Sequence, residues 1–190
     1  VACRYRQHEG NSIRDVELHW RASRNVVERL FERGGLPADV SPLERAALVW
    51  VDLVSARRGY LKGAAAFARA RLGDAMSRDP DMSTTGRRQA LELLLAPGPG
   101  GQALDASAAR AIARAMRASP REMREAVART HMGIFFRAVA ALDWSLARRS
   151  LFDGIRSDPR WLLNRGVIKL GLRALSAGLQ ESRRLRIDAR

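Results

Sequence analysis

Two copies of one helix-start signal restrict the folds that this chain can adopt. Residues 41–44 (Ser-Pro-Leu-Glu) and 119–122 (Ser-Pro-Arg-Glu) both place serine at the N-cap, proline at the first helical position and glutamate at the third. The serine and glutamate side chains can bond the free amides of a first helical turn, and proline already has the φ angle of a helix. Each copy therefore predicts a helix start that needs no tertiary contacts.

Each start signal is paired with an Asp-Pro stop signal, 38 residues later at Asp79-Pro80 and 39 residues later at Asp158-Pro159. The residue before a proline is forced out of the helical conformation, so we expect a helix to end at each site. The two segments therefore predict two helical hairpins. We place the turn between the two helices at Gly59 in the first hairpin and near Asp143 in the second.

Apolar residues recur at helical spacing through most of the remaining chain, and strand signals nearly vanish after residue 6. We expect further helices from Ser12 to Gly34, over residues 85–96 and 105–118, and from Trp161 to Arg186. The predicted fold class is all-α, a bundle or a short solenoid of helical hairpins following one residual N-terminal strand.

Apolar stripes predict which side of each helix is buried. Ser12 is the expected N-cap of the first helix, whose core stripe is Ile13, Val16, Trp20, Val27, Leu30 and Phe31. The stripe after Ser41 is Leu43, Ala47, Trp50 and Val54. In the last helix we expect Leu163, Val167, Leu170 and Leu175 to be buried and Arg165, Lys169 and Arg173 to face outward.

The second hairpin also has a pattern of small and large residues that is typical of a known repeat. The pattern consists of Phe136, Leu142, Asp143, Trp144, Ala147, Leu151, Ile155 and Pro159. It loosely resembles a tetratricopeptide-like helical pair. A helical-repeat scaffold that binds a protein partner is therefore one possible function, and a concave face with exposed aromatic or arginine side chains would favour it.

The chain is strongly basic, with a formal net charge of +14 from 34 basic and 20 acidic residues. Such a charge suits nucleic acid or an anionic membrane surface. The basic residues are almost all arginine and are spread over nearly every predicted helix, which argues against a nucleic-acid interface but leaves anionic-membrane binding as an alternative. The single cysteine, Cys3, excludes an intrachain disulfide framework and fits a reducing cytosol.

A short stretch near the start carries the most specific family signal. Residues 5–13 read Tyr-Arg-Gln-His-Glu-Gly-Asn-Ser-Ile. This stretch resembles a signature near the end of the catalytic domain in many bacterial family 2 glycosyltransferases of the GT-A type. The resemblance implies that residues 1–11 are the closing strand and turn of a mostly missing glycosyltransferase domain and that residues 12–190 are its helical C-terminal domain. Val1 would then lie in mid-protein.

The same resemblance indicates two candidate site residues, Arg6 and His8. In this family the donor is a sugar on a nucleoside diphosphate, and a divalent ion, Mg²⁺ or Mn²⁺, neutralises the leaving diphosphate. Residues two apart on an extended strand share a face, so both side chains could meet the donor diphosphate. His8 could also help to hold the metal. The acidic metal motif and the catalytic base of the family have no match here.

We therefore expect a C-terminal helical region of a nucleotide-sugar-dependent transferase in cell-surface polysaccharide or glycolipid synthesis. The parent enzyme would work in the cytoplasm, at the inner face of the membrane, with the nucleotide-sugar donor bound by the missing domain. The 190 residues alone would bind no cofactor and would be inactive. We expect His19 to be a packing or surface residue and His131 a core or interface residue.

Overall fold

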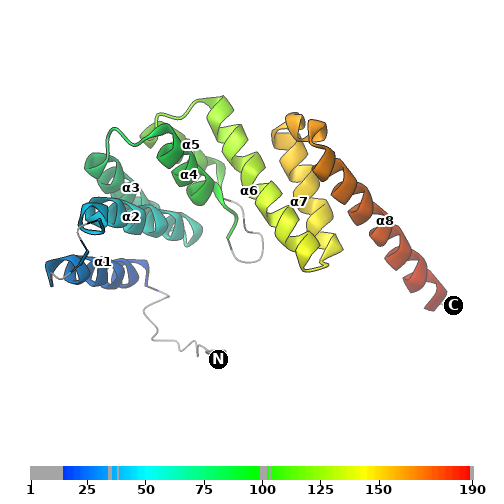
Figure 1. Cartoon of the computed structure of the whole chain (residues 1–190), viewed down its shortest axis with the longest axis horizontal. Coiled ribbons are helices and arrows are strands. Elements are labelled where there is room, and N and C mark those ends of the chain that lie inside the picture. The colour runs from blue at the N-terminus through cyan, green and yellow to red at the C-terminus, as the bar shows by residue number, and fades with distance from the viewer. Residues whose placement is uncertain (1–14, 34–35, 38, 99–101, 103, 189–190) are drawn as a thin grey trace. The chain divides into compact units, whose positions relative to one another are not determined.

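The computed structural model describes residues 15–33, 36–37, 39–98, 102 and 104–188, with side chains up to Ser176. All regular structure in these residues is helical, which confirms the predicted all-α class. The α-helices are α1 (Val16–Glu32), α2 (Glu44–Leu61), α3 (Ala65–Arg78), α4 (Thr84–Leu95), α5 (Ala106–Ala115), α6 (Pro120–Ala140), α7 (Trp144–Ser157) and α8 (Arg165–Asp188) (Figure 1). The described residues also form the short 3₁₀ helices η1 (Ser41–Leu43) and η3 (Pro159–Leu163).

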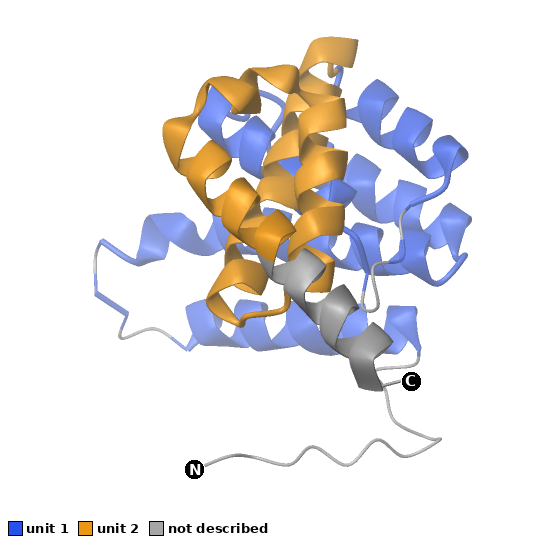
Figure 2. Ribbon diagram, turned by 90° about the vertical axis from the view of Figure 1, so that its right-hand side faces the viewer, with its two compact units in different colours: residues 1–117 blue, residues 118–190 orange. Residues whose placement is uncertain are grey.

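The chain divides into two compact units, residues 1–117 and residues 118–190 (Figure 2). Unit 1 contains α1 to α5, and unit 2 contains α6 to α8 with η3. The predicted boundary between residues 11 and 12, and the predicted N-terminal strand, lie outside the described residues. That boundary stays a prediction, and the helical part has an internal division that the sequence analysis did not anticipate.

Unit 1 is built around the hairpin of α2 and α3, as predicted, with α1 and α4 packed on α2 and α5 on α3. The predicted turn at Gly59 is wrong, because α2 continues to Leu61 and the chain turns at Gly63, which has a φ of 76°. Gly59 instead marks a close helix crossing. A Cβ atom added to Gly59 would lie 3.0 Å from the Cβ of Ala68 on α3.

The predicted core stripe of α2 is also wrong. Leu43, Trp50 and Val54 are exposed, whereas Val49, Leu53, Ala56 and Tyr60 are buried. The sequence contains two apolar stripes on this helix, and the stripe with the smaller residues faces α3 because the two backbones approach closely there. The stripe with Trp50 faces a groove that is described below.

Of the two predicted helix-start signals, the one at Ser119 forms a capping box and the one at Ser41 does not. Ser119 forms a capping box, since its Oγ accepts from the Glu122 amide at 3.2 Å and the Glu122 carboxylate accepts from the Ser119 amide at 2.8 Å. Ser41 is instead the first residue of η1, and α2 has no side-chain cap. Ser12, the predicted N-cap of the first helix, lies outside the described residues. Asp15 caps α1, and its Oδ1 accepts from the amides of Glu17 and Leu18 at 2.9 and 3.0 Å.

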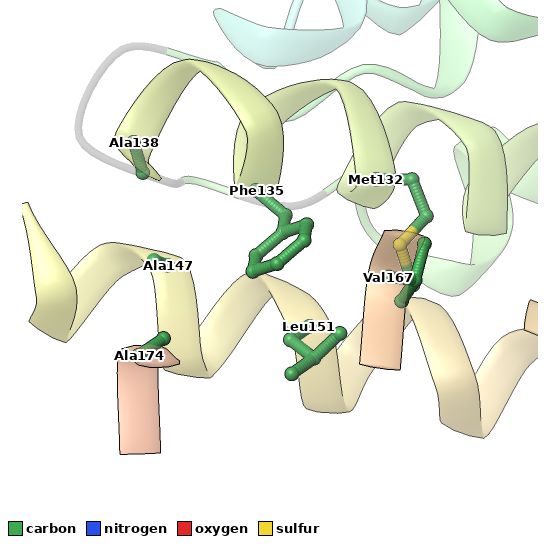
Figure 3. Packing of buried hydrophobic residues seen from close by; sticks show 7 residues of the cluster. All are labelled: Met132, Phe135, Ala138, Ala147, Leu151, Val167 and Ala174. Atoms are coloured by element: carbon green, nitrogen blue, oxygen red, sulfur yellow. The ribbon is translucent and has the colours of Figure 1, made fainter. Parts of the chain in front are cut away.

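Unit 2 is the predicted second hairpin with α8 packed against α7. Asp143 is the N-cap of α7, and α7 ends before Asp158-Pro159, as predicted. Buried side chains from all three helices meet in one cluster (Figure 3), formed by Met132, Phe135, Ala138, Ala147, Leu151, Val167 and Ala174. Phe135, at the centre of this cluster, is fully buried.

The last helix is only partly as predicted. Val167 is buried and Leu170 is half-buried against the cluster, and Arg165, Lys169 and Arg173 are exposed. Leu163 and Leu175 are exposed, so their predicted burial is wrong. The reason for Leu163 is that it belongs to η3, so it does not continue the stripe of α8. Within the described part of the chain, no helix is long and apolar enough to cross a membrane.

Candidate functional site

The two site residues predicted from the sequence, Arg6 and His8, lie outside the described residues. Their roles at the donor diphosphate, and the metal role of His8, stay predictions. Across residues 15–33, 36–37, 39–98, 102 and 104–188, no group of three or more His, Cys, Asp or Glu side chains could hold a metal ion. The described helices form two other candidate sites, one in each unit.

The first feature is an arginine pocket in unit 2, at the start of α6 and the corner between α7 and α8. It consists of two adjoining hollows of about 330 and 360 Å³. Both hollows share Arg121, Glu125, Asp158 and Arg160 in their walls. The remaining wall residues are Arg124, Ser157, Pro159, Arg129, Trp161 and Asn164.

Two carboxylates hold the pocket arginines in place. Asp158 accepts from Arg160 at two points, Nε to Oδ1 at 2.9 Å and Nη2 to Oδ2 at 2.8 Å. Glu125 Oε1 accepts from Arg160 Nη2 at 2.7 Å and from Arg121 Nε at 2.9 Å. These bonds join the first turns of α6 to η3. Paired hydrogen bonds of this fork type fix the orientation of a guanidinium as well as its position.

The pocket stays charged near neutral pH. Hydrogen bonds from Arg121 and Arg160 lower the pKa of Glu125, and hydrogen bonds from Arg160 lower the pKa of Asp158. The same carboxylates, Asp158 first, raise the pKa of Arg160 further above its ordinary value. Both acids are therefore ionised. The walls of the pocket contain four arginines, Arg121, Arg124, Arg129 and Arg160, so the pocket has a net charge of two positive.

Local sequence signals build each wall of this pocket. The Ser119 capping box sets the start of α6, which places Arg121, Arg124 and Glu125 in its first two turns. Pro159 ends α7, and the Oδ1 of Asn164 caps α8 by accepting from the Gly166 amide at 3.0 Å. Sequence analysis missed the pocket because Glu125 and Arg160 are 35 residues apart. The spacing of Arg121 and Glu125, four residues apart, was the one local sign of it.

The second feature is an apolar groove in unit 1, of about 370 Å³, between α1 and α2. Its walls are His19 and Ser23 of α1 and Ala47, Trp50, Val51, Val54 and Ser55 of α2. The exposed α2 stripe that was predicted as core lines this groove. His19 is the polar group of interest, with its Nδ1 3.5 Å from the Oγ of Ser23. Burial, and then the positive charge of Arg58, lower the pKa of His19.

The two features differ in what they can do. The arginine pocket offers fixed guanidinium donors and ionised carboxylates already bonded to them, which suits the binding of an anion. The groove offers apolar walls and a neutral imidazole, which suits one apolar side chain. His131, the third histidine, is half-buried on α6 with its Nδ1 3.9 Å from Asp153 Oδ2, so it belongs to neither site. Comparison of the chain with protein-family models, with curated proteins and with solved structures found no match.

Proposed function

We propose that this chain is the helical C-terminal region of a nucleotide-sugar-dependent glycosyltransferase in cell-surface polysaccharide or glycolipid synthesis. The observation that carries the proposal is the stretch at residues 5–13, which resembles the end of the catalytic domain in bacterial family 2 enzymes. The described residues that follow it are helical, which is what the proposal requires of a C-terminal extension.

In this proposal Arg6 and His8 lie at the donor diphosphate. Departure of a nucleoside diphosphate develops negative charge on phosphate oxygens, and positive groups fixed beside them lower the barrier. A divalent ion supplies most of that stabilisation when bound. The guanidinium of Arg6 would contact the phosphate oxygens, and His8 would either donate to them or help to orient the ion. The other ligands would belong to the nucleotide-binding domain.

The coding sequence upstream of Val1 tests the proposal. We expect a strand-rich domain of about 200 residues, an ordinary domain size, with an acidic metal motif directly after a strand. The 190 residues alone should give a helical circular-dichroism spectrum without turning over a nucleoside diphosphate sugar. Multiple-turnover transfer by the purified 190 residues, or an upstream region without such a domain, would contradict the proposal.

A second candidate function is a helical scaffold that binds a protein partner, and the apolar groove of unit 1 favours it. Trp50 and Val54 are partly exposed there, beside the half-buried His19. An apolar side chain on a partner helix would fit between α1 and α2. In a binding assay with a candidate partner, Trp50→Ala should weaken the complex while Val26→Ala, an exposed change on α1, should not. Equal affinities of all three proteins would remove this function.

A further inference from the structure

We propose that unit 2 binds the surface of an anionic phospholipid bilayer, with the arginine pocket taking a lipid phosphate and exposed leucines entering the interface beside it. Arg160 of the pocket and the exposed Leu163 belong to the same 3₁₀ helix, η3, which packs against α8 within unit 2. The proposal does not depend on the glycosyltransferase assignment, because it uses only described residues of unit 2.

The first contribution is the supply of free N–H donors in the pocket. Arg160 uses Nε and Nη2 for Asp158 and Glu125, and Arg121 uses Nε for Glu125. Arg124 makes no hydrogen bond or ion pair to another described residue, so its whole guanidinium remains available. A planar guanidinium matches the oxygens of a phosphate with two parallel bonds. Arg121 and Arg160 are therefore already oriented by their carboxylates, whereas the exposed Arg124 would become ordered on a bound phosphate.

The second contribution is a set of large apolar side chains that no described residue covers. Leu163 of η3 is 83% exposed and Leu172 of α8 is 63% exposed. Ile168, Leu172 and Leu175 share one side of α8, because they are spaced by four and three residues. This side lies next to the packed side that contains Val167 and Ala174. Exposed groups of large apolar side chains on a folded unit are typical of a surface that contacts another molecule.

Both η3 and α8 carry basic side chains next to exposed apolar ones. Arg160 and Leu163 belong to the same five-residue 3₁₀ helix, which therefore places a pocket arginine beside the most exposed of the leucines whose side chains the structure describes. On α8 the exposed basic residues Arg165, Lys169 and Arg173 follow the apolar side around the helix. Long basic side chains at the edge of an apolar face can reach phosphates while the apolar residues enter the interface.

These features favour a bilayer over other anionic partners. A nucleic acid would engage the arginines, but its backbone offers no apolar layer for Leu163 and Leu172. A protein partner with an acidic groove would also need apolar side chains in that groove to contact Leu163 and Leu172. An anionic bilayer supplies phosphates and an apolar layer within a few ångströms of each other, and its negative potential attracts a chain with a net charge of +14.

The test is co-sedimentation of the full chain with vesicles of phosphatidylcholine, with and without phosphatidylglycerol. We expect binding to the anionic vesicles only, falling as ionic strength rises. Arg121→Gln with Arg124→Gln should lower the partition coefficient by roughly 25-fold, since each charge contributes about fivefold near such a surface. The matched control Arg110→Gln with Arg114→Gln removes two exposed arginines of α5 and should lower it far less.

A second variant pair tests the apolar contribution. Leu163→Ser with Leu172→Ser should weaken binding by on the order of tenfold or more, because two large apolar side chains no longer leave water. Leu18→Ser with Val26→Ser changes exposed residues of α1 and should leave binding unchanged. All four variants alter exposed positions, and circular dichroism should show the wild-type helix content in each.

Three results would overturn the proposal. Equal binding to vesicles with and without phosphatidylglycerol would show that charge does not contribute. Equal losses in the pocket pair and the α5 pair would show that only net charge matters. The third result is wild-type vesicle affinity in the leucine variant, with soluble glycerophosphate competing for binding. It would show that the pocket binds a free phosphate ester and that unit 2 does not insert apolar side chains into a bilayer.

Discussion

The indole Nε1–H of Trp20 donates a hydrogen bond of 2.8 Å to Oδ1 of Asp52. The other oxygen of Asp52, which is only 2% exposed, accepts from Nε of Arg78 at 3.1 Å. The guanidinium of Arg71 lies over the Trp20 ring, 3.8 Å from its centroid. One buried carboxylate therefore joins α1, α2 and α3, and α1 has no fully buried residue of its own to replace that link.

Removing this carboxylate should destabilise unit 1. Asp52→Ala leaves the Trp20 indole and the Arg78 guanidinium without their acceptor, at a cost of about 2 to 4 kcal/mol for a buried charged partner. Asp74→Ala is the control, since Asp74 pairs with Arg71 at 2.9 Å on a more exposed part of α3 and should cost less than about 1 kcal/mol. Urea unfolding measures both. Similar losses in the two variants would mean that the Asp52 link contributes no more than a surface ion pair.

Two glycines of the α2–α3 hairpin should respond in opposite directions to alanine. Gly59→Ala places a methyl group 3.0 Å from Ala68 Cβ and 3.3 Å from its Cα, so a helix would have to move. Gly73→Ala meets nothing within 4 Å and should stabilise α3 by up to about 1 kcal/mol. Thermal unfolding should therefore shift down for Gly59→Ala and up for Gly73→Ala. An upward shift in both would show that α2 and α3 are not in close contact at Gly59.

His19, in the apolar groove, should make the stability of unit 1 depend on pH. Burial and Arg58 hold the pKa of His19 below its ordinary 6.5 in the folded state, whereas the unfolded chain keeps the ordinary value. The unfolded state then binds more protons just below pH 6.5, so stability is fully present above that pH and falls as pH decreases toward the lowered pKa. His19→Gln should remove this component of the urea-unfolding profile. If the free energy of unfolding depends on pH in the same way in His19→Gln and in the wild type, this prediction is wrong.

Local sequence signals predicted the helix boundaries that depend on a few neighbouring residues. The capping box at Ser119 and the stop at Asp158-Pro159 are examples, because each acts within one turn. The buried face of α2 could not be predicted in this way, since it depends on how closely α3 approaches Gly59. The arginine pocket was missed for a similar reason, because Arg160 meets Glu125 only after α6 and α7 fold back on each other.

Hydrogen exchange should separate the packed and exposed sides of α8. Val167 and Ala174 are buried against α6 and α7, so amides from Val167 to Leu175 should be protected without lipid. Vesicles would contact the neighbouring exposed side, which contains Leu172, and should change this protection little. Rapid exchange that slows only with anionic vesicles would show that α8 forms on the membrane and does not pack in solution.

The most direct test of the proposed function is sugar transfer from a nucleoside diphosphate donor by the full-length protein, comparing wild type with His8→Ala. The control is His131→Gln, a change on α6 far along the sequence from residues 5–13. We expect His8→Ala to lower turnover by about ten- to a thousandfold, the loss expected when one donor to developing charge is removed, with unchanged circular dichroism and a control near the wild-type rate. A wild-type rate in His8→Ala, or a loss that comes only from unfolding, would contradict the account.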